Sequence, residues 1–223
     1  MNAVYDQKAD ALRLDLQVIA SWIEPGSRVL DLGCGNGDLL AYLKSHKQVQ
    51  ATGIEFSEER AAYCIERGLT VLQGDFCQEI CDYPDHCFDV VILSHTLQQV
   101  RNPKQLLMDM LRIGRRVIVS FPNYAHWHVR VQVFLTGLAP VTDQLPYEWY
   151  DTPNIRIICL KDFKRFLRKF GMQAVREVAI NTHHHEVKGN LVRYLKNLRA
   201  TYGIFMLEFA GDAQQTMQEI DHG

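Results

Sequence analysis

The chain has little net charge and no long apolar run. Its 24 basic and 26 acidic side chains leave a formal net charge of −2, so its electrostatics do not favour a nucleic-acid partner. No apolar run reaches the roughly 20 residues that a membrane-spanning helix needs. The first residues, MNAVYDQKADALRLDL, also lack the apolar centre of a signal peptide. We therefore expect a cytoplasmic protein that binds neither membranes nor nucleic acids.

Cysteine and histidine are present, but not at metal-binding spacings. The six cysteines form no pair of CxxC motifs, and they stand at positions 34, 64, 77, 81, 87 and 159. The run His183-His184-His185 is conspicuous. Three consecutive side chains fan apart and cannot all face one ion, so we interpret the run as a solvated loop. The sequence therefore predicts no metal site.

The chain does contain a regular alternation of apolar and helical segments. Five strand-like runs, separated mostly by helical patterns, cover residues 27–32, 49–55, 69–75, 88–94 and 115–121. Near-continuous apolar strands in this order are typical of a doubly wound parallel sheet that is covered on both faces. We expect one Rossmann-like α/β domain over residues 1–210 and a loose polar tail over residues 211–223.

The alternation stops after Phe121. Residues 122–160 are rich in aromatic side chains, contain several prolines and show no obvious strand–helix order. We expect this insertion to lie over the carboxyl end of the fifth strand. It could form an acceptor pocket or lid, a surface for a protein partner, or a small satellite core. The candidate residues of a pocket or partner surface are His95, Tyr124, His126, Trp127 and Tyr150.

One turn carries three glycines at alternate positions, within the stretch VLDLGCGNGDLL. Gly33, Gly35 and Gly37 are spaced G-x-G-x-G, whereas a nicotinamide site usually has G-x-G-x-x-G. Asp31 lies two residues before the first glycine. Its carboxylate would repel a pyrophosphate but attract the ammonium and sulfonium of S-adenosylmethionine (SAM). The turn, including Cys34, therefore favours SAM over a nicotinamide cofactor or a ligand-free turn.

Two further acids follow the next two strands. Glu55 ends the second strand, where a carboxylate can accept hydrogen bonds from both ribose hydroxyls, and Phe56 follows it. Asp75 ends the third strand, where it can accept from an adenine amino group while Phe76 lies near the ring. Ser94, at the end of the fourth strand, completes the predicted cofactor site. Acids at three successive strand ends indicate SAM or S-adenosylhomocysteine as the cofactor.

The stretch LDLGCGNG, followed by Glu55 and by Gly74-Asp75, resembles the class I SAM-dependent methyltransferases. The resemblance implies a mostly parallel seven-stranded sheet that ends in a reversed hairpin. Three further segments are similar to the bacterial MetW family of methionine-biosynthesis proteins: SHTLQQVRNP, VIVSFPNYAHWHVRVQVFLTGLAPVT and LPYEWYDTPNIR. That similarity implies association with a homoserine O-acyltransferase in the acylation of homoserine. The interval NTHHHEVKGNLVRYLK departs from the shorter link expected in the family.

No catalytic residue can be assigned from the sequence. Methyl transfer is served mainly by holding two groups together, and a base is needed only when the acceptor loses a proton. His95, His126 and His128 are the nearest candidates for a base, although such histidines are more often structural. The sequence predicts a SAM-binding protein that acts with homoserine O-acyltransferase. The alternatives are a SAM-dependent methyltransferase of a small molecule and, disfavoured by the glycine spacing, a nicotinamide oxidoreductase.

Overall fold

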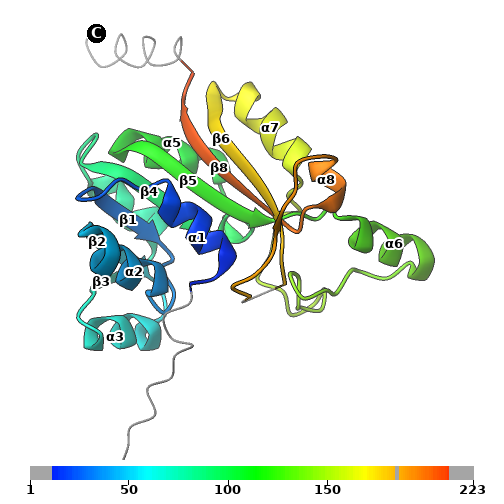
Figure 1. The fold of residues 1–223 in the computed structure, drawn as a ribbon, viewed down its shortest axis with the longest axis horizontal. Coiled ribbons are helices and arrows are strands. Elements are labelled where there is room, and N and C mark those ends of the chain that lie inside the picture. Colours follow the sequence, from blue (N-terminus) through cyan, green and yellow to red (C-terminus); the bar gives the residue numbers. More distant parts are fainter. Residues whose placement is uncertain (1–11, 184–185, 211–223) are drawn as a thin grey trace, which may run out of the picture.

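Eight strands form one sheet, with helices on both of its faces (Figure 1). The computed structural model describes residues 12–183 and 186–210. The strands lie in the order β3-β2-β1-β4-β5-β8-β6-β7. Their bounds are β1 Arg28–Leu32, β2 Gln50–Glu55, β3 Thr70–Gln73, β4 Phe88–Ser94, β5 Gly114–Pro122, β6 Met172–Asn181, β7 Asn190–Leu191 and β8 Tyr202–Phe209. The predicted Rossmann-like α/β fold is confirmed.

The helices alternate with the strands up to β5. Their bounds are α1 Leu14–Ser21, α2 Asp38–Lys47, α3 Glu58–Glu66, α4 Phe76–Glu79, α5 Pro103–Ile113, α6 Trp127–Thr136, α7 Leu160–Lys169 and α8 Lys196–Arg199, with 3-10 turns η1 Ile80–Asp82 and η2 Leu97–Gln99. Ser57 caps α3 by accepting from the backbone N–H of Arg60 at 3.4 Å. Asn102 caps α5, which starts with Pro103. Side-chain caps of this kind satisfy the free N–H groups of a first turn.

Strands β1 to β5 run parallel, and β8 runs antiparallel between β5 and β6. This is the reversed hairpin that the sequence resemblance implied. The predicted count of seven strands is wrong by one, because β7 adds a short edge strand beside β6. The link between these two strands is fixed at Thr182. Its N–H donates to Thr201 Oγ1 at 3.0 Å, and its hydroxyl donates to the Lys188 carbonyl at 2.8 Å.

Two apolar layers sandwich the sheet. Side chains of α5 and α7 pack against one face, and side chains of α1 and α2 pack against the other. The central strands β1, β4 and β5 are therefore buried on both faces, which explains their continuous apolar sequence.

The segment between β5 and α7 contains a helix that the sequence does not predict. Helix α6 ends at Gly137, which adopts φ 67°. It lies at the tip of a projection that points away from the sheet (Figure 1, right). We call residues 127–157 the arm. The N–H of Tyr124 donates to the carbonyl of Ile158 at 3.1 Å and closes its base. Within the described ranges, no helix is long and apolar enough to cross a membrane. The predicted tail, residues 211–223, lies outside them.

Candidate functional site

The glycine turn between β1 and α2 borders a cavity of about 590 Å³. Gly33 and Gly35 line it, with φ of 71° and 58°. The cavity lies at the carboxyl ends of β1 and β4, where the strand order reverses, which is the usual ligand position in such sheets. Gly37 is not part of the cavity. A Cβ there would come within 2.5 Å of Leu69 and 2.9 Å of Cys64, so Gly37 serves the packing of the turn.

The cavity gathers most of the predicted cofactor residues. Those that line it are Asp31, Gly33, Cys34, Gly35, Glu55, Phe56, Phe76 and Ser94. His95, predicted for the acceptor pocket or partner surface, lines it too. The lining also includes residues that the sequence analysis missed: Arg13, Leu16, Asn36, Asp38, Leu39, Arg60, Thr96 and Gln99. Arg13 and Leu16 come from the segment that enters and forms α1, about 20 residues before the turn, and no motif marks them. That the predicted residues bind a cofactor stays a prediction.

Glu55 ties the glycine turn to the end of β2. Its Oε2 accepts a hydrogen bond from the N–H of Gly35 at 2.8 Å, and its Oε1 accepts from the N–H of Ser57 at 2.9 Å. The side chain is buried. Each carboxylate oxygen has two lone-pair sites, so both oxygens can still accept from a ligand hydroxyl. The Glu55 carboxylate therefore holds the glycine turn in place and can still accept hydrogen bonds from two ligand hydroxyls.

Asp31 is a buried carboxyl group at the bottom of the same cavity. Its Oδ1 has no hydrogen-bond partner among the described residues. Burial, and then the nearby carboxylate of Glu55, raise the pKa of Asp31 to about 7, although the Arg13 guanidinium opposes the change. A buried charged group without a partner is costly. The site therefore favours a cationic ligand group beside Asp31.

Asp75 lies in an adjoining cavity of about 530 Å³. The two cavities share the lining residues Phe56, Phe76, Thr96 and Gln99, so they form one elongated groove. Asp75 caps α4, because its Oδ1 accepts from the N–H of Cys77 at 2.9 Å. The groove thus carries Asp31 at one end, Asp75 at the other and aromatic rings between them.

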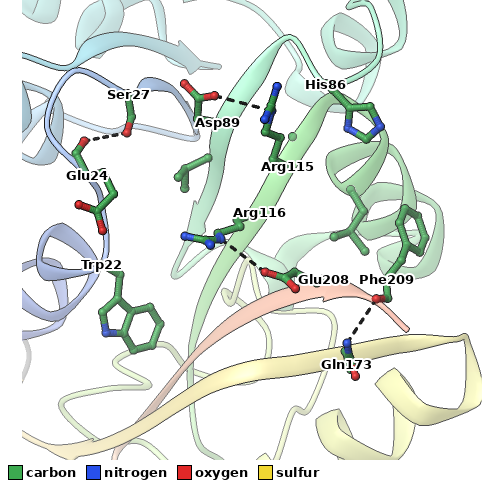
Figure 2. Close-up of a pocket in the computed structure, with 13 residues that line it drawn as sticks. Trp22, Glu24, Ser27, His86, Asp89, Arg115, Arg116, Gln173, Glu208 and Phe209 are labelled. Carbon is green, nitrogen blue, oxygen red and sulfur yellow. Dashed lines mark hydrogen bonds and ion pairs between the residues drawn. The ribbon is translucent and has the colours of Figure 1, made fainter. Parts of the chain in front are cut away.

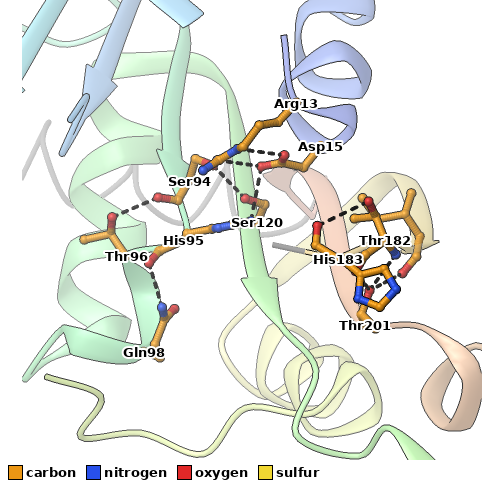
Figure 3. A network of polar contacts seen from close by, with 11 residues as sticks. Arg13, Asp15, Ser94, His95, Thr96, Gln98, Ser120, Thr182, His183 and Thr201 are labelled. Atoms are coloured by element: carbon orange, nitrogen blue, oxygen red, sulfur yellow. Dashed lines mark hydrogen bonds and ion pairs between the residues drawn. The ribbon is translucent and has the colours of Figure 1, made fainter. Parts of the chain in front are cut away.

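A polar network ties α1 to the rim of the groove (Figure 3). Arg13 donates two hydrogen bonds to the buried carboxylate of Asp15, at 3.2 and 3.0 Å. His95 Nε2 lies 3.2 Å from the same carboxylate. His95 has a φ of 53°, which is uncommon for a residue with a side chain. Its ring also stacks on Tyr202, with 4.6 Å between centroids. The structure thus holds an imidazole firmly at the rim.

The other predicted pocket residues do not reach the groove. Tyr124, His126, Trp127 and Tyr150 line neither of its two cavities. Tyr124 and His126 are half-buried at the base of the arm, and burial lowers the pKa of His126. Trp127 and Tyr150 are exposed. The structure therefore does not assemble the predicted acceptor pocket beside the groove, because the arm turns outward after β5.

The histidine run does not form a metal site with the described residues. His183 pairs with Asp143, with 2.8 Å between Nδ1 and Oδ2. His184 and His185 lie outside the described residues. Among residues 12–183 and 186–210, no group of three or more His, Cys, Asp or Glu side chains could hold a metal ion.

A further cavity of about 490 Å³ lies at the opposite end of the sheet (Figure 2). Two ion pairs lie in its lining: Arg116 lies 3.4 Å from Glu208, and Arg115 lies 3.9 Å from Asp89. Ligands of doubly wound sheets bind at the other end, beyond the carboxyl ends of the strands. The groove that contains Asp31 and Glu55 is therefore the candidate site.

Solved structures share this fold. A SAM-dependent methyltransferase from Thermotoga maritima superposes with a TM-score of 0.63, at 21% identity, over 87% of each chain. Another from Archaeoglobus fulgidus gives a TM-score of 0.64 at 16% identity, over 86% of this chain and 90% of that one. The chain has the fold of the class I SAM-dependent methyltransferases.

The family described as methionine biosynthesis protein MetW matches residues 13–207. The chain belongs to the MetW family. The bifunctional methionine biosynthesis protein MetXA/MetW of Rhodopirellula baltica is 35% identical over 176 residues, which are 75% of this chain and 28% of that protein. Phosphoethanolamine N-methyltransferase 1 of Arabidopsis thaliana is 29% identical over 109 residues, 44% of this chain and 21% of that protein. The chain thus matches only about a quarter of the length of these relatives.

Proposed function

We propose that the groove binds SAM or S-adenosylhomocysteine. The observation that carries this proposal is the buried carboxyl group of Asp31, whose Oδ1 has no hydrogen-bond partner among the described residues, beside a glycine turn held by Glu55. Asp31 would receive the ammonium of the ligand, and Glu55 would accept from its ribose hydroxyls. Arg13 supplies a positive charge for the ligand carboxylate at the same end. Asp75 and Phe76 would hold the adenine. When bound, SAM supplies a methyl group on a positively charged sulfur.

Isothermal titration calorimetry with SAM and with S-adenosylhomocysteine tests this assignment. We expect Glu55→Ala to weaken binding roughly ten- to a hundredfold, because one or two charge-assisted hydrogen bonds are lost. Glu58→Ala is the matched control, because Glu58 is an exposed acid at the start of α3 that does not line the groove. Equal affinities of the Glu55→Ala variant and the wild-type chain would refute the site.

We infer further that the chain acts in methionine biosynthesis together with a homoserine O-acyltransferase. Membership of the MetW family supports the pathway. The R. baltica relative supports a partner, because its name joins a MetXA part and a MetW part in one bifunctional protein. A SAM-binding partner would let the end product of the pathway act on an early step. By linkage, SAM changes the affinity for the acyltransferase by the same factor as the acyltransferase changes the affinity for SAM.

Copurification of the chain with the homoserine O-acyltransferase of the same organism tests the partnership. The experiment is done with and without saturating SAM. We expect a complex in at least one condition and a measurable difference between the two. Absence of a complex in both conditions would remove the partnership, and equal recovery in both would remove the sensing role.

A small-molecule methyltransferase is the second candidate. It is favoured by His95, an imidazole that is held by Asp15 at the rim of the groove. Proton removal by such a group would suit an acceptor that must lose a proton. Incubation of the protein with methyl-labelled SAM and a small-molecule extract discriminates the two functions, because a pure binding protein leaves all acceptors unlabelled.

A further inference from the structure

The arm exposes large apolar side chains to solvent. The most exposed are Phe134 at 87%, Leu135 at 72%, Leu138 at 67%, Trp149 at 73%, Tyr150 at 72% and Ile157 at 77%. At about 150–250 Å² for a large side chain, the six expose roughly 700–1,100 Å². Monomeric proteins seldom leave so much apolar surface uncovered in one projection. The area is close to the roughly 800 Å² that each partner contributes to a stable protein–protein interface.

Helix α6 has little to hold it within this chain. Val129 is its single buried residue. Most helical stability in proteins comes from packing of an apolar face, and α6 packs only its first turn. Most of the helix surface is therefore not packed against this chain.

The composition of the arm favours a protein over a lipid surface. From residue 127 to residue 141, Arg130 is the one side chain that is charged at neutral pH, and the rest of the arm carries more acids (Asp143, Glu148, Asp151) than bases (Arg156). Helices that lie on membranes are rich in lysine and arginine on their polar face. Interface centres are instead depleted of charge and enriched in tryptophan, tyrosine and phenylalanine. Trp149, Tyr150 and Phe134 fit the second description.

We propose that the arm is the docking surface for the homoserine O-acyltransferase. This inference rests on the proposed function, which supplies the partner. The name of the R. baltica relative joins a MetXA part and a MetW part in one bifunctional protein, which supports a partner of this kind. The arm is an uncovered apolar surface of the right size for this contact, and it leaves the groove accessible because it does not line it.

The returning segment of the arm is hydrogen-bonded to the rim of the groove. The N–H groups of Ile155 and Arg156 both donate to the carbonyl of Gln98 at 3.0 Å. The side-chain amide of the buried Gln98 donates in turn to the carbonyl of His95 at 2.6 Å. His95 and Thr96 line the groove (Figure 3). A ligand that moves this loop therefore moves the backbone of the docking surface.

The test uses the full chain with the double substitution Phe134→Asp/Leu135→Asp. The control is Ile65→Asp, which places a charge on an exposed apolar position of α3, outside the arm and the groove. Affinity for the purified homoserine O-acyltransferase is measured by biolayer interferometry. We expect the arm variant to bind at least about thirtyfold more weakly, and the control to bind within about twofold of the wild-type chain. SAM affinity, measured by calorimetry, is expected to stay unchanged in both variants, which shows that they are folded.

The experiment distinguishes failure of the proposed partnership from failure of the proposed docking surface. If the wild-type chain does not bind the acyltransferase, the proposed partnership fails and the inference falls with it. If the wild-type chain and the arm variant bind equally well, the partnership stands and the docking surface is wrong. If the substitution converts a dimer of this chain to a monomer in sedimentation velocity while acyltransferase binding persists, the arm instead joins two copies. Binding of the wild-type chain, but not the variant, to anionic vesicles would likewise overturn the proposal.

Discussion

Replacing the buried Asp31 by asparagine is expected to stabilise the ligand-free protein and to impair its ligand binding. Burial raises the pKa of Asp31 from 3.8 to about 7, so the folded chain prefers the neutral carboxyl group. The contribution of the protonated Asp31 to the free energy of unfolding is fully present below pH 3.8 and is lost as the pH rises through about 7. At 1.36 kcal/mol per pH unit, the loss amounts to about 4 kcal/mol above pH 7. An asparagine side chain cannot ionise, so the Asp31→Asn variant avoids this loss.

Urea unfolding without ligand, from pH 4 to pH 8, measures this effect. We expect the advantage of Asp31→Asn to grow with pH and to reach about 2–4 kcal/mol, the lower value allowing for an unpartnered buried amide. At the acid end the two proteins should differ little. If the difference between the unfolding free energies does not change with pH, Asp31 has an ordinary pKa and the argument for a cationic ligand is lost.

SAM binding should favour the ionised form of Asp31, whereas folding favours the neutral form. An ammonium group attracts ionised Asp31, so SAM affinity rises with pH, and for a pKa of about 7 it is roughly eightfold weaker at pH 6 than at pH 7.5. Near pH 7, binding should release about half a proton, which calorimetry in two buffers of different ionisation enthalpy detects. The Asp31→Asn variant should bind at least about a hundredfold more weakly, without this pH dependence. A variant that keeps the same pH dependence would assign it to another group.

Three substitutions test neighbouring parts of the structure. Gly33→Val should abolish SAM binding in calorimetry, because a branched side chain would stand where the ligand approaches the turn; binding at wild-type strength would contradict this. Gly37→Ala should lower the unfolding free energy by about 1–3 kcal/mol, because the new Cβ would clash with Leu69 and because a φ of 76° is unfavourable for alanine. Unchanged urea unfolding would count against the packing role of Gly37. Ser57→Ala should cost about 1 kcal/mol through loss of the α3 cap, measured by the same urea titration.

The sequence contains most of the information that builds the sheet. Strand β4 has the predicted bounds, and Ser57 and Asn102 cap the helices that follow them, because these features depend on local chemistry. Helix α6 is different. Its three valines have lower helix propensity, and its apolar residues face solvent on several sides, so no amphipathic pattern marks it. A helix with one buried residue lacks the pattern that packing within its own chain would impose.

The candidate site was predictable only in part, for a similar reason. Asp31 and Glu55 stand at strand ends, and neighbouring parallel strands bring their carboxyl ends to one edge, so their proximity follows from the fold class. Arg13 and Leu16 reach the groove through the placement of α1 across the sheet, which depends on tertiary packing. The contact of His95 with Asp15 depends on the same placement, and no local sequence feature predicts the unusual backbone of His95.

The double tether of Glu55 has a consequence for selectivity. Its two backbone hydrogen bonds hold the carboxylate in place without a ligand. With the proposed ribose contact, this end of the groove would treat SAM and S-adenosylhomocysteine alike. The two compounds differ by one methyl group and one positive charge, and that charge would lie toward Asp31. A carboxyl group with a pKa of about 7 is half ionised at neutrality. Small changes in acidity around neutral pH would therefore change the ratio in which the groove holds methylated and demethylated cofactor.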